Sequence, residues 1–158
     1  MKQEAAALVG PIDGIADYGT SWRKSLGAKL EKLGIKTINP TDYFKPQGMD
    51  IHIGRQALEE ARSSRNWSRL VEIMDGIWRF NEEIVTEATF LVASWSQRVS
   101  AGGTIREMQK AFEQGKPVYV IYDKDPRLIN CHLLHLIYKN GRIFSSEKEL
   151  IDFLTKRP

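Results

Sequence analysis

Short apolar runs alternate along the chain with stretches in which apolar residues recur at helical spacing. The runs at 5–9, 35–39, 90–93 and 117–121 have the length of buried strands. After the first run, one helix face is formed by Trp22, Leu26, Leu30 and Leu33. Thr20 or Ser21 is expected to cap that helix. Strands that alternate with helices predict an α/β fold with a parallel sheet and helices on its faces.

One βαβ unit, between 89 and 122, has the clearest pattern. Its first strand leads into a polar loop at 94–103 and then into a helix that ends at Gly115. The apolar face of this helix consists of Ile105, Met108, Ala111 and Phe112. Ligands of open α/β sheets bind at the carboxyl ends of strands, so we expect a site at this loop.

The middle of the chain is expected to combine a loop with one long helix. Between 41 and 65 the pattern is weak, which indicates an aromatic-bearing loop, a candidate lid, with a short helix at 56–62. The long helix covers 66–88 and is expected to bend at Gly76. One apolar stripe consists of Trp67, Leu70, Met74, Ile77, Ile84 and Ala88, with Asn81 inside it, and a second consists of Val71, Trp78 and Val85. Two apolar lines on one helix indicate contact with the sheet on one side and with a second subunit on the other.

The C-terminal part is less specific. The segment 132–138 fits either a helix or a strand, Asn140 and Gly141 indicate a turn, and 143–144 is expected to be a short last strand. Ser146 and Glu149 form a capping box that opens a final helix.

Composition narrows the class of protein. The 158 residues are 42% hydrophobic and 27% charged, which is typical of one globular domain over 1–158. A net charge of +3 and the lack of a long basic run argue against a nucleic-acid polymer as partner. The single Cys131 excludes an intramolecular disulfide. The N-terminus lacks a signal peptide's apolar core and no run reaches membrane length, so we expect a soluble, cytoplasmic protein.

Glu107 is the candidate catalytic residue of the βαβ unit. It lies in the first predicted turn of the helix, where its carboxylate can point over the strand end. The spacing from Thr104 to Glu107 by itself favours a capping box, in which the acid only closes the helix start. No metal or cofactor is expected, because His132 and His135 have no evident third ligand and common cofactor motifs are missing.

Several short motifs occur in a particular order. Gly10 and Pro11 follow the first strand, Trp22 and Arg23 open the first helix, and Asn39 and Pro40 end the second strand. The segment Gly103-Thr104-x-x-Glu107 precedes a helix that ends in Gly115-Lys116-Pro117-Val118. This set resembles the nucleoside 2-deoxyribosyltransferase family, including related deoxynucleoside 5'-monophosphate N-glycosidases, over about residues 5–155.

The resemblance implies a flavodoxin-like, Rossmann-like parallel sheet of about five strands and an oligomeric enzyme. It implies that Glu107 is a nucleophile that forms a covalent deoxyribosyl-enzyme, as retaining glycosidases do. The sugar would pass to another nucleobase or to water. The candidate substrate-binding residues are Gly10, Pro11, Asp13, Asp17, Arg23, Asn81, Ser94, Gly103 and Thr104. Asp13 and Asp17, which stand shortly before glycines, also fit a turn-forming role. The expected partner is a small nucleoside or nucleotide, with the 2'-deoxy sugar preferred.

The chain departs from the family pattern at three places. Ala7 stands where a tyrosine near the end of strand one often orients the nucleophile, and Asn81 stands where an aspartate is common. The loop after strand three, from Ser94 onward, lacks the usual aspartate at 94–98. Two alternatives therefore stay open: a nucleotide-binding or sensing module of the same fold, and an interaction protein that docks through its long helix.

Overall fold

The computed structural model describes residues 3–12, 15–95 and 102–157, and within them five strands form one parallel sheet. The strands are β1 (Ala5–Val9), β2 (Lys36–Ile38), β3 (Phe90–Ser94), β4 (Val118–Ile121) and β5 (Arg142–Phe144). Their order in the sheet is β2-β1-β3-β4-β5, and all four pairings are parallel. The α/β prediction, including the flavodoxin-like sheet of about five strands, is confirmed.

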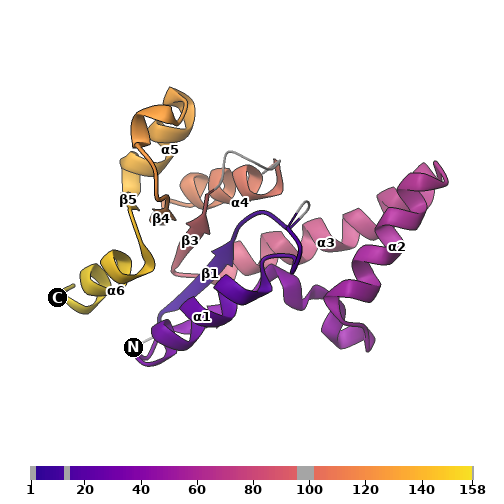
Figure 1. Ribbon diagram of the computed structural model, residues 1–158, viewed down its shortest axis with the longest axis horizontal. Coiled ribbons are helices and arrows are strands. Elements are labelled where there is room, and N and C mark those ends of the chain that lie inside the picture. The colour runs from indigo at the N-terminus through magenta and orange to yellow at the C-terminus, as the bar shows by residue number, and fades with distance from the viewer. Residues whose placement is uncertain (1–2, 13–14, 96–101, 158) are drawn as a thin grey trace.

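Helices cover both faces of the sheet (Figure 1). One face packs against α3 (Trp67–Glu87), α4 (Gly102–Glu113) and α5 (Cys131–Asn140), and the other against α1 (Thr20–Glu31) and α6 (Glu147–Thr155). The central strands read as uninterrupted apolar runs because both of their faces are buried: all five residues of β1 are buried. The ambiguous segment at 132–138 is helical and belongs to α5.

The segment expected to be a loop at 41–65 is mostly helical, so that prediction was wrong. It contains a 3-10 helix, η1 (Pro40–Gln47), and α2 (Ile51–Ser63), which is longer than the short helix expected at 56–62. Asp50 caps α2 by accepting a hydrogen bond from the Ile53 backbone N–H at 3.0 Å. Phe44 is buried against Gly54, where a Cβ atom would lie 2.4 Å from the ring. This contact joins η1 to α2.

Only the C-terminal end of α3 packs on the sheet. Ile84 and Val85 are its buried residues, whereas Trp67 is 56% exposed. The N-terminal part of the helix extends away from the sheet beside α2 (Figure 1). The expectation that one continuous stripe of α3 faces the sheet was therefore wrong for its first half, which leaves an edge of this helix free to line a pocket.

Gly76 does not interrupt α3, which runs as one helix. A Cβ atom at this position would lie 2.1 Å from the Tyr43 hydroxyl oxygen. Gly76 therefore permits the close approach of η1 to α3, and it does not serve to bend the helix as expected. No helix in the described ranges is long and apolar enough to cross a membrane.

Candidate active site

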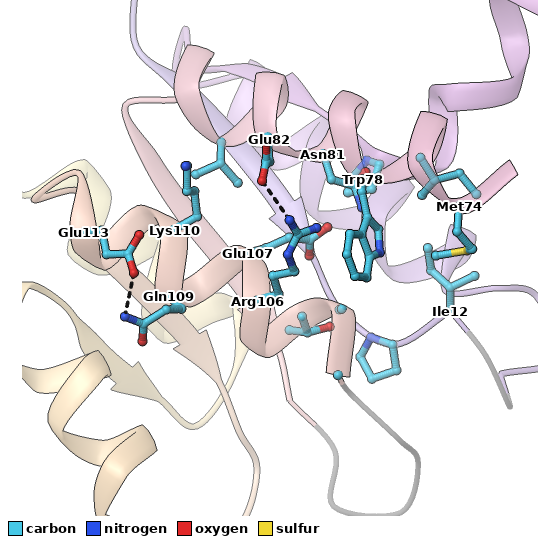
Figure 2. A pocket seen from close by; sticks show the side chains of 18 of the residues that line it. Ile12, Met74, Trp78, Asn81, Glu82, Arg106, Glu107, Gln109, Lys110 and Glu113 are labelled. Carbon is cyan, nitrogen blue, oxygen red and sulfur yellow. Dashed lines mark hydrogen bonds and ion pairs between the residues drawn. The ribbon is translucent and has the colours of Figure 1, made fainter. Parts of the chain in front are cut away.

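A pocket of about 580 Å³ opens beside the carboxyl end of β1 (Figure 2). Its walls come from the turn after β1, from η1 and α2, and from the facing sides of α3 and α4. Six of the residues expected at a site line this pocket: Gly10, Pro11, Asn81, Gly103, Thr104 and Glu107. The chain thus brings the end of the first strand, the long helix and the start of α4 to one cavity.

Glu107 is a buried acid that faces this cavity. Its side chain belongs to the buried face of α4 and only 8% of the residue is exposed. Among the described residues, none donates a hydrogen bond to its carboxylate. Burial raises the pKa of Glu107 to about 7, against the opposing effect of the positive charges on Arg23 and Arg106. Its carboxyl group can therefore exchange a proton, or attack as a carboxylate, near neutral pH.

The helix start excludes the capping interpretation of Glu107. The described part of α4 already begins at Gly102, so Thr104 is inside the helix and not at its cap position. Thr104 is itself buried on the same face as Glu107. Ile105, which was expected on the apolar face, is exposed. The buried face of α4 was predicted to be purely apolar, but it includes two polar residues, Thr104 and Glu107.

Arg23 does not reach the pocket as a substrate contact would. Its residue is 2% exposed, and its guanidinium donates to the backbone oxygens of Leu8, Gly10 and Gly19 at 3.0 Å each. Its donors are directed at the connection between β1 and α1. Arg23 does not line the pocket, so this placement does not fit the substrate contact expected from its position beside the first turn.

Asp17 has a local role at the start of α1. Its carboxylate accepts hydrogen bonds from the backbone N–H groups of Gly19 at 3.0 Å and Ser21 at 2.8 Å. Hydrogen bonds from Ser21, through its side chain first, hold the pKa of Asp17 below its ordinary value. The helix cap residue is Gly19, without a side-chain bond of its own, so the predicted capping by Thr20 or Ser21 was wrong. Asp17 does not line the pocket.

Of the remaining candidates, Ser94 lies outside the cavity and Asn81 lines it. Ser94 ends β3 and is half-buried, but it is not a lining residue. Asp13 lies outside the described residues. Asn81 does line the pocket, and its buried Oδ1 atom has no hydrogen-bond partner in the described part of the chain. A buried amide oxygen without a donor is costly, so this side chain fits a contact that a ligand completes.

The sequence alone did not indicate the charged and aromatic residues at the mouth of the pocket. Arg106 donates to Glu82 at 2.8 Å, and its guanidinium lies 3.9 Å from the ring centre of Trp78. Figure 2 shows Arg106 reaching from α4 toward both residues on α3. On α3, Trp78 lies three positions before Asn81 and four positions before Glu82, so helical spacing makes it a neighbour of both. Arg55 was missed because its helix was expected to start only at 56.

The arrangement suits chemistry at a single carbon or proton of a small ligand. A buried carboxyl group with a pKa of about 7 can act as a nucleophile or as a general acid–base group. Among the described residues, no group of three or more histidine, cysteine, aspartate or glutamate side chains could hold a metal ion.

Comparison with known proteins gives likenesses in structure. No protein-family model matches the sequence, and no curated protein does. The structure is similar to the CMP N-glycosidase BcmB of Clostridium botulinum, with a TM-score of 0.52, 16% identity and coverage of 96% of this chain and 99% of that one. It is also similar to a 2-deoxyribosyltransferase of Bacillus psychrosaccharolyticus, with a TM-score of 0.62, 16% identity and coverage of 96% and 95%. A conserved protein of Enterococcus faecalis gives a TM-score of 0.63 and 18% identity, with coverage of 99% and 100%. At these identities, the likenesses establish a shared fold over nearly the whole chain.

Proposed function

We propose that this protein breaks the N-glycosidic bond of a nucleoside or nucleotide, with Glu107 as the nucleophile. The observation that carries the proposal is the position of Glu107, a buried carboxylate with a raised pKa on the wall of the pocket at the sheet's carboxyl edge. The names of two structures with the same fold, a CMP N-glycosidase and a 2-deoxyribosyltransferase, support this reaction class.

In the proposed reaction, an ionised Glu107 oxygen attacks C1' of the sugar. The bond from C1' to the base nitrogen breaks, and its electron pair leaves with the base. The sugar is then held as an ester on Glu107. A nitrogen of a second base, or the oxygen of water, attacks C1' and restores the carboxylate. When water attacks, its proton is released to the solvent or to the departed base.

The departing base needs a proton that Asn81 cannot supply, because an amide has no acidic proton near neutral pH. The Asn81 side chain can instead hydrogen-bond the base from α3. The base would then take its proton from solvent at the mouth of the pocket. We propose that 2'-deoxy sugars react faster, since a 2'-hydroxyl disfavours positive charge at C1' and needs room beside Glu107.

A binding or sensing module without turnover is the second candidate. It is favoured by Asn81 and Ala7, which occupy positions where the resembled family often has an acid and a tyrosine. The two functions differ in one observable, the release of free base from a bound nucleoside or nucleotide.

Incubation with ribo- and deoxyribonucleosides and their 5'-monophosphates, followed by chromatography of free base, tests the proposal. Base released only when an acceptor base is present indicates transfer, and base released without one indicates hydrolysis. Glu107→Gln should abolish release, whereas Glu87→Gln, at an exposed surface ion pair with Lys36, should leave it unchanged. Binding without any release would support the sensing module, and equal ribo and deoxyribo rates would contradict the sugar preference.

We further propose that the protein is at least a dimer that pairs through α3. Val71 and Trp78 are 53% and 47% exposed, and together with Trp67 they place large apolar side chains on one exposed helix. Val85, expected in the same line, is instead buried in the core, so the contact would involve only the first two thirds of the helix. A two-fold contact between copies would bury these side chains most simply. Because Trp78 also lines the pocket, a second copy would lie close to the site.

A further inference from the structure

Arg23 is a buried cation without an ion pair in the described part of the chain. A buried charge is costly unless its hydrogen-bonding groups are satisfied. The guanidinium meets this requirement with backbone carbonyls: Nε donates to Leu8, Nη2 to Gly10, and Nη1 to both Gly19 at 3.0 Å and Tyr18 at 3.3 Å. Neutral partners leave its positive charge uncompensated at short range.

These bonds hold the connection between β1 and α1 at both of its ends. Leu8 is in β1 and Gly10 follows its last residue, while Tyr18 and Gly19 precede α1 and both have positive φ values, 53° and 70°. A positive φ is unfavourable for a tyrosine and persists only when neighbouring structure enforces it. Arg23 supplies that constraint through the two carbonyls. Gly10 also lines the pocket, so the same guanidinium fixes part of the pocket wall.

The position of the cation is fixed by close packing. A Cβ atom on Gly19 would lie 2.4 Å from Nη1 of Arg23, and one on Gly10 would lie 2.9 Å from the Trp22 ring. The guanidinium also lies 4.7 Å from the ring centre of Trp22. The charge therefore cannot move toward solvent without breaking the turn.

We propose that Arg23 is a positioning residue for Glu107: it fixes the turn that lines the same pocket as this carboxylate and places a buried positive charge at that turn. The electrostatic coupling supports this in both directions. Of the two cations that lower the pKa of Glu107 against the effect of burial, Arg23 has the larger effect and Arg106 the smaller. Burial lowers the pKa of Arg23 to about 10, and of the two acids that oppose this effect, Glu107 acts more strongly than Asp17.

Other charged groups around the two residues are better screened. Arg106, on the same helix as Glu107, is 42% exposed in its side chain and paired with Glu82 of α3. Lys110 and Glu113 of α4 and Arg55 of α2 also line the pocket. Asp17 acts on Arg23 from the turn before α1, but its carboxylate is solvated. Solvent weakens the effect of exposed charges on a buried group. Arg23 is therefore the cation with the largest effect on the pKa of Glu107.

This inference rests on the proposed function only for its consequence in catalysis. A nucleophilic Glu107 must be ionised to attack C1', and a nearby cation increases the ionised fraction at a given pH. The same charge favours departure of the Glu107 carboxylate from the sugar in the second step. Without Arg23, the group would ionise only at a higher pH, and turnover would require more alkaline conditions.

Nuclear magnetic resonance of the full-length wild type tests the coupling without a change at Arg23. The Arg23 Nε–H signal, assigned in the wild type by through-bond correlation to the Arg23 backbone, should persist in water because it is buried and hydrogen-bonded. Its chemical shift should change with pH at the midpoint at which the Glu107 carboxyl carbon titrates. That change should be absent in Glu107→Gln. An Nε–H signal that ignores the Glu107 titration would overturn the proposal, whether or not any Arg23 variant folds.

Variants then measure the size of the effect. Arg23→Met should raise the pKa of Glu107 by about one unit, and Arg23→Lys, which keeps the charge, should raise it less. Arg69→Met, at an exposed ion pair with Glu72 on α3, is the matched control and should leave this pKa unchanged. If wild type cleaves nucleosides, the rise of rate with pH should move by the same amount as the pKa.

The outcomes separate this inference from the proposed function. A shifted Glu107 pKa in a protein that releases no base would support the role of Arg23 and refute the cleavage reaction. Base release with the same Glu107 pKa and the same pH profile in folded Arg23→Met would refute the role of Arg23 and leave the reaction intact. A purely structural arginine would lower the melting temperature without moving the pH profile.

Discussion

Replacement of Glu107 by glutamine should stabilise the protein at alkaline pH. Glutamine keeps the size and polarity of the side chain but carries no charge. Burial raises the pKa of Glu107 from its ordinary value of 4.5 to about 7, so the folded protein holds its proton more tightly than the unfolded chain does. Between these two pH values, the unfolded chain binds fewer protons, and the free energy of unfolding therefore falls as pH rises.

The difference of the two pKa values sets the size of the effect. One pKa unit corresponds to about 1.4 kcal/mol, so an ionised Glu107 costs roughly 3 kcal/mol of stability above pH 7. Glu107→Gln should regain about this amount at pH 8. Below about pH 4.5 the acid is neutral in both states, and the two proteins should differ little.

Urea unfolding followed by tryptophan fluorescence at several pH values measures this difference, since the chain has four tryptophans. Protomer concentration must be held fixed, because association adds to apparent stability. Glu87→Gln, at an exposed position, is the control and should show no comparable pH dependence. A stability difference between wild type and Glu107→Gln that is the same at pH 4 and pH 8 would refute a raised pKa at Glu107.

Three further predictions concern the pocket and its surroundings. The initial rate of base release should rise with pH through about 7 as Glu107 ionises, and a flat profile from pH 5 to 9 would contradict a carboxylate nucleophile. Gly76→Ala should lower stability by up to about 2 kcal/mol, because its Cβ atom would lie 2.1 Å from the Tyr43 hydroxyl oxygen and this overpacking outweighs the gain of about 1 kcal/mol for alanine over glycine in a helix. In thermal unfolding the alanine should cost less when Tyr43→Phe is present, and an equal effect in both backgrounds would contradict this packing. Trp78→Glu should lower the oligomeric state in sedimentation, and a wild type that is monomeric at micromolar concentration would contradict pairing through α3.

The sheet could be predicted from the sequence because its strands are short and buried on both faces. Such strands appear as uninterrupted apolar runs, and β1 and β3 were placed almost to the residue. The helical segment at 40–63 was missed because Pro46 and Gly48 resemble loop residues and Gly54 weakens the helical pattern. Gly54 is explained only by its contact with Phe44, which sequence periodicity does not contain.

The candidate site was predicted in part for a similar reason. The carboxyl ends of parallel strands meet at one edge, so the turn at Gly10 and the helix that carries Glu107 could be expected together. The local role of Asp17 could also be expected, because its position before Tyr18 and Gly19 is typical of a turn. The role of Arg23 could not, because it depends on backbone groups brought close by folding. A motif gives the type of such a residue, whereas its hydrogen-bond partners decide whether it contacts a ligand or holds a turn.

The most direct test of the proposed reaction is detection of the sugar on Glu107. A reaction with a 2'-deoxynucleoside 5'-monophosphate or a 2'-deoxynucleoside, quenched with acid during turnover, would be digested and analysed by mass spectrometry. We predict one sugar attached at Glu107, within peptides that contain 107–110, and no attachment in Glu107→Gln. Free base released at an undiminished rate by Glu107→Gln, with no modified peptide in the wild type, would contradict the account.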